Sequence, residues 1–138
     1  MDETTQHKTI LIVEDDNELR EALSTALSYE HFTVLAADNG ATGLGIALEK
    51  HPDLILLDVV MPHMDGLTVL GKLREDEWGK GVPVIIMTVL DDLEKIAAVV
   101  AAGGDEYVIK AEITLGALVQ KVKDRLARAA VGIQKPHK

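Results

Sequence analysis

Leu54-Ile55-Leu56-Leu57-Asp58 is a run of four aliphatic residues that ends in an acid. A strand with one face in solvent alternates apolar and polar residues, whereas an unbroken apolar run is typical of a strand covered on both faces, as in a parallel sheet. Thr9-Ile10-Leu11-Ile12-Val13 has the same character and is followed directly by Glu14-Asp15-Asp16. Both runs therefore predict buried parallel strands whose carboxyl ends carry carboxylates.

Similar apolar runs recur along the chain, with helical patterns between them. Three further strands are predicted at 32–36, 82–87 and 106–109. Apolar residues at helical spacing separate the strands. This alternation, with every strand expected to be buried on both faces, predicts an α/β fold with a doubly wound five-stranded parallel sheet built from five βα units. We expect one domain over residues 9–128, an N-terminal tail of residues 1–8 and a C-terminal tail of residues 129–138.

Composition and charge exclude several classes of protein. The chain has 138 residues, 14 Lys+Arg, 23 Asp+Glu and no Cys, so disulfide scaffolds, thiolate zinc sites and thiol catalysis are excluded. No apolar run approaches the ~20 residues needed to cross a bilayer. With no signal pattern either, we expect a cytoplasmic protein without membrane contact.

The net charge of −9 is unevenly distributed: residues 1–119 carry −14, from 8 basic and 22 acidic residues, and residues 120–138 carry +5, from 6 basic residues and one acid. The acidic body would repel phosphates, so no direct nucleic-acid binding is expected. We interpret the basic segment as a solvated helix end rather than a docking arm.

The polar residues at the strand ends form a candidate site. Parallel strands bring their carboxyl ends to one edge of the sheet, where ligands bind in such folds. The residues at this edge are Glu14, Asp15, Asp58, Thr88 and Lys110. Three carboxylates in one crevice need a cation, and oxygen ligands suit Mg²⁺ or, in its place, Mn²⁺. Carboxylates, a divalent metal, a lysine and a hydroxyl are the groups that phosphoryl transfer uses, with Asp58 as the best placed nucleophile.

Other functions on this fold stay open from the residues alone. A phosphatase with an aspartyl nucleophile would need a second acid two residues after Asp58, where Val60 stands. A flavin mononucleotide carrier would need a first loop rich in Ser, Thr and Gly, where this chain has acids. Each site residue taken singly also fits an ordinary loop, cap or core edge. We interpret His63 as a loop histidine rather than a metal ligand, and Trp78 as packing under a loop.

The chain resembles the receiver domain of bacterial two-component response regulators over roughly residues 8–128. The matching stretches are, in order, 10–16, 52–58, Met61-Pro62 with Asp65-Gly66, 83–88 and 107–110. The resemblance implies a flavodoxin-like receiver topology and a protein that is not an enzyme beyond its own phosphorylation and dephosphorylation. It also implies that Asp58 takes a phosphoryl group from a histidine kinase or phosphotransfer protein, and that the domain then controls an unknown downstream protein target.

The resemblance implies a role for each matching side chain. The implied Mg²⁺ ligands are Glu14, Asp15, Asp58 and the backbone carbonyl of Val60. Asp16, the third acid in the row, is expected to cap a helix. Thr88 would be the switch hydroxyl that moves toward the phosphoryl group, and Tyr107 the aromatic partner that turns inward with it. Lys110 would contact the phosphoryl group itself.

Two positions depart from the family pattern. Ala111 follows Lys110 where the family usually has proline, and we expect a trans peptide bond there because a non-proline cis bond costs ~2.5–4 kcal/mol. Val89 follows Thr88 where a small residue is usual, and its branched side chain would crowd the phosphoryl site and limit attacking water. These departures keep one alternative open, a degenerate receiver that binds its partner without phosphorylation.

The fourth helix, expected over 93–102 and capped by Asp91 and Asp92, is the candidate output surface. Its core stripe is predicted to be Leu93, Ile96, Ala97, Val100 and Ala101. Val99 would then face solvent. The resemblance implies that this helix, the strand with Tyr107 and the last helix form a partner or homodimer surface. The kinase, the stimulus, the target, the oligomeric state, and whether the chain stands alone or is part of a longer regulator are left open.

Overall fold

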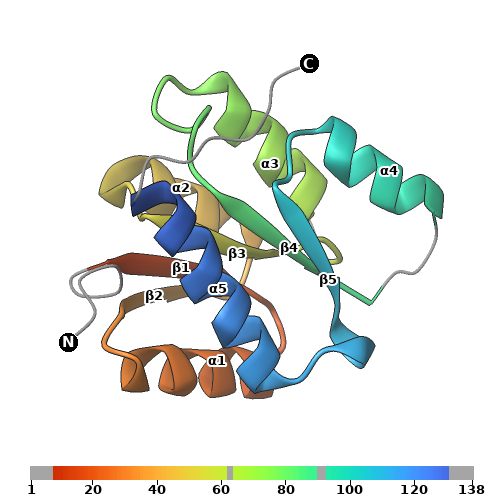
Figure 1. Cartoon of the computed structure of the whole chain (residues 1–138). Coiled ribbons are helices and arrows are strands. Elements are labelled where there is room, and N and C mark those ends of the chain that lie inside the picture. Colours follow the sequence, from red (N-terminus) through yellow and green to blue (C-terminus); the bar gives the residue numbers. More distant parts are fainter. Residues whose placement is uncertain (1–7, 62–63, 90–92, 131–138) are drawn as a thin grey trace.

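Five parallel strands form one sheet in the order β2-β1-β3-β4-β5 in the computed structural model, which describes residues 8–61, 64–89 and 93–130 (Figure 1). The strands are β1 (Thr9–Val13), β2 (Thr33–Ala37), β3 (Leu54–Asp58), β4 (Val84–Thr88) and β5 (Glu106–Ile109). The helices are α1 (Asn17–Tyr29), α2 (Gly40–Lys50), α3 (Gly66–Glu75), α4 (Leu93–Ala101) and α5 (Leu115–Ala130), with a 3₁₀ turn η1 at Lys110–Glu112. The predicted doubly wound parallel sheet is confirmed.

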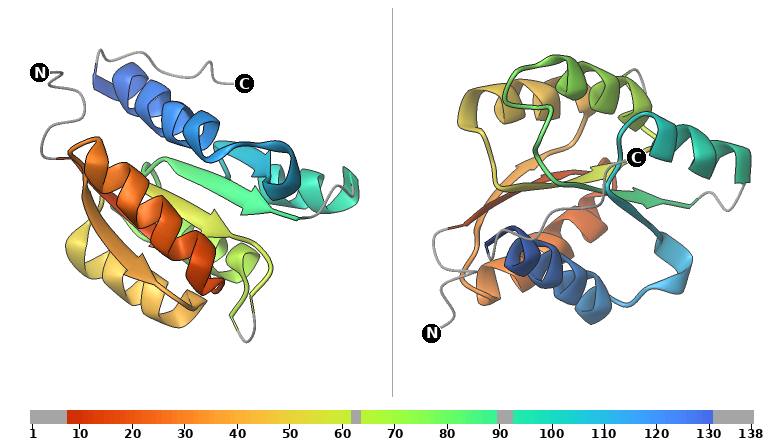
Figure 2. Two further views of the ribbon diagram at one scale, coloured as in Figure 1. Left: turned by 90° about the horizontal axis from the view of Figure 1, so that it is seen from below. Right: turned by 45° about the horizontal axis from the view of Figure 1, so that its top comes forward.

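Helices cover the two faces of the sheet as separate layers (Figure 2): α1 and α5 lie on one face, and α2, α3 and α4 lie on the other. Successive side chains of a strand point to opposite faces. Ile10 and Ile12 of β1 accordingly pack under α1 and α5, whereas Leu11 and Val13 pack under α2 and α3. Both faces of β1 need apolar side chains, which explains its unbroken apolar run. Among the described helices, none is both long enough and apolar enough to span a membrane.

The edge strands differ from the prediction. Burial on both faces holds for β1, β3 and β4, but it is wrong for β2 and β5, where Thr33, Ala36 and Tyr107 are exposed. Each of these strands has a neighbour on one side only, so the covering helices leave part of it in solvent. The second and fourth strands also begin one and two residues later than predicted, with Pro83 just before β4.

Helix ends follow local capping chemistry. Oδ1 of Asp16 accepts hydrogen bonds from the backbone N–H groups of Glu18 at 3.0 Å and Leu19 at 3.3 Å, so the predicted cap of α1 is confirmed. The predicted caps Asp91 and Asp92 lie outside the described residues. The side chain of Asp16 is thus engaged at the start of α1, and the acids that cluster at the strand ends are Glu14, Asp15 and Asp58.

The buried face of α4 is one position away from the predicted stripe. Val99, expected to face solvent, is 4% exposed and packs in the core, whereas Val100, expected in the core, is 58% exposed. Ala97 and Ala101 are also exposed; the side chains of Leu93 and Ile96 lie outside the described residues. The pattern failed because this helix is rich in alanine and valine on all sides, and such a sequence does not define which face is buried.

The basic residues of α5 form ion pairs, and those of Lys121 and Arg128 remain largely in solvent. The four in the described part of the chain pair with acids: Lys121 and Arg128 with Glu106, Lys123 with Glu30, and Arg125 with Asp105. Exposed ion pairs contribute little to stability. Their effect here is to neutralise the positive charge of α5, which argues against a basic docking arm in this part of the chain.

Candidate functional site

The strand ends bring the predicted site residues to one edge of the sheet. Asp58 is the last residue of β3, the central strand, and Thr88 is the last residue of β4 beside it. Val13 pairs with Leu57, so Glu14 comes level with Asp58 on the other side. Lys110 follows β5 directly. Each residue is thus placed at the carboxyl end of a strand of the sheet.

Lys110 lies between the two buried acids. Its Nζ is 2.8 Å from Oε1 of Glu14 and 3.3 Å from Oδ2 of Asp58. Glu14 is fully buried and Asp58 is 2% exposed. The second oxygen of each acid accepts a backbone hydrogen bond: Oε2 of Glu14 from the N–H of Asp16 at 3.0 Å, and Oδ1 of Asp58 from the N–H of Val60 at 3.1 Å. Both carboxylates are therefore held in one orientation.

The electrostatics of the site leave an excess of negative charge. The pKa of Asp58 is raised to about 7: burial is the largest cause, the charge of Glu14 adds to it, and Lys110 and the N–H of Val60 oppose the rise. Burial disfavours the charged form of Lys110, but its hydrogen bonds and ion pairs with Glu14 and Asp58 outweigh this and raise its pKa. One ammonium faces two buried acids and one exposed acid, so a further cation would be stabilised here.

The donor set fits a magnesium ion. Carboxylate oxygens of Glu14, Asp15 and Asp58 lie within 4.8 Å of one another. Two of these residues are buried, and Asp15 is exposed at the mouth of the site. An all-oxygen set suits Mg²⁺ or Mn²⁺ and does not suit zinc. The backbone carbonyl of Val60, two residues beyond Asp58, stays a predicted ligand.

The two predicted switch residues sit on neighbouring strands. Thr88 is 3% exposed and pairs in register with Ile109 of β5. Tyr107, two residues before Ile109, is 41% exposed and lies outside the carboxylate cluster. The structure therefore shows an outward Tyr107 beside a buried Thr88, and their switching roles stay predictions.

The positions that depart from the family pattern are also at this edge. Val89 is 60% exposed and Val60 is 49% exposed, so two valines lie beside Thr88 and Asp58 and face solvent. The described residues contain no cis peptide bond, and Lys110–Ala111 is trans as expected. His63 lies outside the described residues.

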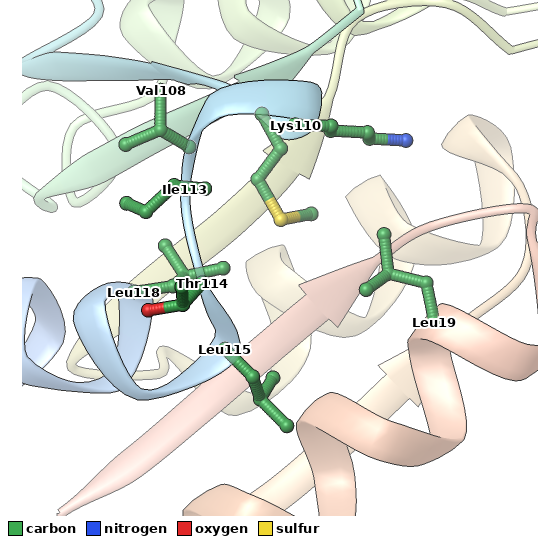
Figure 3. Close-up of a pocket in the computed structure, with 8 residues that line it drawn as sticks. Leu19, Val108, Lys110, Ile113, Thr114, Leu115 and Leu118 are labelled. Atoms are coloured by element: carbon green, nitrogen blue, oxygen red, sulfur yellow. The ribbon is translucent and has the colours of Figure 1, made fainter.

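An apolar hollow beside Lys110 was not predicted. It has a volume of about 80 Å³ and is lined by Leu19, Met87, Val108, Lys110, Ile113, Thr114, Leu115 and Leu118. In Figure 3, Leu19 of α1 faces Leu115 and Leu118 of α5 across it, and the ammonium of Lys110 points away from it. Its lining combines the segment from Val108 to Leu118 with Leu19 of α1 and Met87 of β4, which are distant in sequence, so no local pattern signalled it. It gives the stem of Lys110 an apolar wall while its tip contacts carboxylates.

Comparison with known proteins agrees with this geometry. Residues 10–123 match the family model described as response regulator receiver domain. The chain is 37% identical over 126 residues to the probable transcriptional regulatory protein TcrX of Mycobacterium tuberculosis, which covers 91% of this chain and 53% of TcrX. It is 40% identical over 101 residues to the regulatory protein AtoC of Escherichia coli, covering 73% of this chain and 22% of AtoC. The chain thus spans about half or less of the length of these two relatives.

Solved structures share the fold. A receiver domain protein described as CheY-like from Methanospirillum hungatei superposes with a TM-score of 0.84 at 28% identity, covering 91% of this chain and 98% of that chain. A putative response regulator from Chloroflexus aurantiacus gives a TM-score of 0.81 at 31% identity, covering 89% of this chain and 100% of that chain.

Proposed function

Because the chain belongs to the response regulator receiver domain family, we propose that it accepts a phosphoryl group on Asp58 from a histidine kinase or phosphotransfer protein. The observation that supports this most directly is Lys110, whose ammonium lies between Glu14 and Asp58 in a cluster with Asp15. A degenerate receiver would not need this charge arrangement. The same cluster repels free phosphate unless a cation is bound, which disfavours a flavin mononucleotide carrier.

The residues present supply the parts of a phosphoryl transfer. Glu14, Asp15, Asp58 and the carbonyl of Val60 would hold Mg²⁺, which when bound neutralises charge on the phosphoryl oxygens. Asp58 is held by the N–H of Val60 and by Lys110, so its carboxylate is oriented before the donor arrives. Its oxygen forms the new bond to phosphorus as the P–N bond of the donor phosphohistidine breaks, and the electron pair of that bond stays on the imidazole. Lys110 offsets negative charge on the transferred group.

The consequences of phosphorylation would be read by protein partners. We propose that Thr88 moves toward the phosphoryl group and that Tyr107 turns inward from its exposed position. The surface of α4, β5 and α5 would then change shape and control a downstream protein or a second copy of the chain. The domain would act as a switch in the cytoplasm and would catalyse only its own phosphorylation and dephosphorylation.

Direct nucleic-acid binding by this unit is not part of the proposal. The described part of α5 has its four basic residues paired with acids, and the chain carries a net charge of −9. The name of TcrX as a transcriptional regulatory protein describes a chain of which this sequence matches about half.

Intact mass spectrometry tests the phosphoacceptor. The chain is incubated with acetyl phosphate and Mg²⁺, and we expect its mass to increase by one phosphoryl group. The same incubation with EDTA in place of Mg²⁺ should give no increase. Asp58→Asn should abolish the increase. Asp124→Asn, which removes an exposed carboxylate on α5, is the matched control and should be modified like the wild type. A mass increase that persists in Asp58→Asn would contradict the assignment.

A further inference from the structure

Arg74, near the end of α3, donates hydrogen bonds from all three nitrogens of its guanidinium to other segments of the protein. Nε and Nη2 donate to the carbonyl of Gly103 at 3.0 and 2.7 Å, and Nη1 donates to the carbonyls of Gly79 and Val82 at 2.7 and 2.9 Å. Nη2 also donates to Oδ2 of Asp105 at 3.3 Å. A guanidinium has five N–H donors, and these hydrogen bonds use all of them.

The hydrogen bonds of Arg74 join segments that are distant in sequence. Gly79 and Val82 lie in the loop before β4, and Gly103 lies in the turn between α4 and β5. Asp105 extends the junction, because its Oδ2 accepts the N–H of Val84 at 2.7 Å, where β4 begins. The starts of β4 and β5 are therefore tied together at the edge of the sheet opposite to the candidate site.

The backbone conformation and close packing of Gly103 fit this junction. Its φ is +103°, a conformation that residues with a Cβ rarely adopt, and a Cβ at this position would lie 3.0 Å from Nε of Arg74. Figure 1 shows α4 at the margin of the molecule, with its C-terminal end meeting the start of β5. Val99 is buried beside Ile86 and Gly104, whereas Ala97, Ala98, Val100 and Ala101 are exposed. Among the described side chains of α4, Val99, near the C-terminal end, is the one that packs in the core.

We propose that Arg74 is a positioning residue for the output surface: it holds the turn between α4 and β5 in place, so that phosphorylation of Asp58 shifts α4 about Gly103 and leaves the junction unmoved. This inference rests on the proposed function, since it describes how phosphorylation of Asp58 changes the position of α4. Moving Gly103 away would break two charge-assisted hydrogen bonds and leave a mostly buried guanidinium partly unsatisfied, whereas the exposed face of α4 has no such contacts to lose.

Hydrogen exchange with and without beryllofluoride, a mimic of the phosphoryl group, tests this role in the presence of Mg²⁺. The amides of Gly103, Gly104 and Asp105 are hydrogen-bonded to Val100, Val99 and Val84, so their exchange is slow enough to follow. In the wild type we expect beryllofluoride to change exchange in 97–101 by about twofold or more and to leave 103–105 unchanged. In Arg74→Met the change should extend through 103–105.

For each variant, the exchange rates with and without beryllofluoride are compared. A substitution that only destabilises the fold would raise exchange equally in both conditions. Arg125→Met is the matched control: it removes another cation from Asp105, at 3.4 Å, but leaves the bonds to Gly103 intact. It should behave like the wild type. Fluorescence of Trp78, the single tryptophan, gives a second readout, since it precedes Gly79 and stacks on His51 at 4.4 Å. We expect its emission to respond to beryllofluoride only in Arg74→Met.

Several results would overturn the role of Arg74. A wild-type chain that exchanges differently at 103–105 with beryllofluoride overturns it without any variant, and so the test does not depend on the folding of Arg74→Met. An Arg74→Met chain whose response stays within 97–101, or an Arg125→Met chain whose response spreads in the same way, also overturns it. If mass spectrometry finds no phosphoryl group on Asp58 of the wild type, the proposed function fails instead, and the role of Arg74 falls with it.

Discussion

The ammonium nitrogen of Lys110 lies 3.3 Å from Oδ2 of Asp58, and it is also held by Glu14 at 2.8 Å. A single cation therefore balances two acids that have almost no access to water. Removing one partner of a buried ion pair leaves the other charge uncompensated, which costs more than the pair itself contributes. Lys110 is thus the cation that favours the charged form of Asp58, against burial and the charge of Glu14.

Lys110→Met should slow phosphorylation of Asp58 by acetyl phosphate by about tenfold or more, since charge on the transferred group loses its fixed cation. It should also move the midpoint of the rate-against-pH curve upward, because Lys110 lowers the pKa of Asp58. Mass spectrometry at a series of pH values measures both effects. Lys80→Met, which removes an exposed lysine paired with Glu77, is the control and should leave rate and midpoint unchanged.

Asp58→Asn should stabilise the protein without metal, and more so at alkaline pH. With a pKa near 7, Asp58 keeps its proton in the folded state to a higher pH than in the unfolded chain, where the value is 3.8. The folded state then binds more protons in this window, so the stability contributed by Asp58 is present below pH 4 and is lost as pH rises through 7. Asparagine does not titrate and avoids this loss.

Denaturant unfolding in EDTA at about pH 5 and about pH 8 checks this sign. The advantage of Asp58→Asn over the wild type should grow between the two values, up to a few kcal/mol. Asp124→Asn, exposed on α5, should show no such growth. An advantage that is equal at both pH values would mean that Asp58 is not the titrating group.

Mg²⁺ should raise the melting temperature of the wild type. Ligand binding to the folded state alone adds RT ln(1 + [L]/Kd), about 2.7 kcal/mol at a hundredfold excess over Kd. It should also relieve repulsion among Glu14, Asp15 and Asp58, although Lys110 already offsets part of that repulsion. Calorimetry with millimolar Mg²⁺ against Na⁺ of equal ionic strength measures the shift.

Asp15→Asn provides the sharper comparison for the metal site. Asp15 is the exposed member of the three acids, so its replacement should not disturb the core. We expect this variant to melt in EDTA at the wild-type temperature or slightly above it, since one of three repelling charges is gone, and to lose most of the Mg²⁺ shift. The same shift in Asp15→Asn and in the wild type would place the metal elsewhere.

The position of β3 could be predicted from the sequence, whereas the buried face of α4 could not. The run from Leu54 to Leu57 has one physical interpretation, a strand covered on both sides, and the geometry of parallel strands then brings Asp58 beside Glu14. The phase of α4 could not be read in the same way. The helix itself consists largely of alanine and valine, so its sequence does not define a buried face. Packing against Ile86 and Gly104 decides that Val99 rather than Val100 is buried.

Contacts to backbone atoms explain what else could not be predicted. Arg74 donates four of its five hydrogen bonds to carbonyls, which every residue has, so the sequence carries no mark of its partners. The direct contact of Lys110 with Glu14 was also not foreseen. The sequence predicts a contact of Lys110 with the phosphoryl group, and only the folded structure shows that its ammonium bridges two acids.

Val89→Ala should shorten the lifetime of the phosphorylated form a few-fold. Val89 is 60% exposed directly after Thr88, where its branched side chain can shield the phosphoryl group from attacking water. Decay after removal of acetyl phosphate is followed by intact mass. Val100→Ala truncates another exposed valine on α4 and should decay like the wild type. Equal or slower decay in Val89→Ala would reject the shielding role.

Val99 and Val100 offer a matched pair for the output surface, since adjacent residues on α4 are 4% and 58% exposed. Glutamate at position 100 stays in water, so Val100→Glu should keep the melting temperature and the phosphorylation of Asp58. If the surface of α4, β5 and α5 forms a dimer after phosphorylation, the introduced charge should abolish most of the self-association that beryllofluoride induces in light scattering. Val99→Glu buries an unpaired charge and should instead lower the stability by several kcal/mol.

The pair separates interface from core because the same chemical change is made one residue apart. A loss of association in Val100→Glu with wild-type stability assigns this face of α4 to the dimer. If beryllofluoride induces the same self-association in the wild type and in Val100→Glu, this face of α4 is not the dimer interface. Its partner would then be a different protein. Equal destabilisation by both substitutions would contradict the exposed position of Val100, since only a charge removed from water carries that cost.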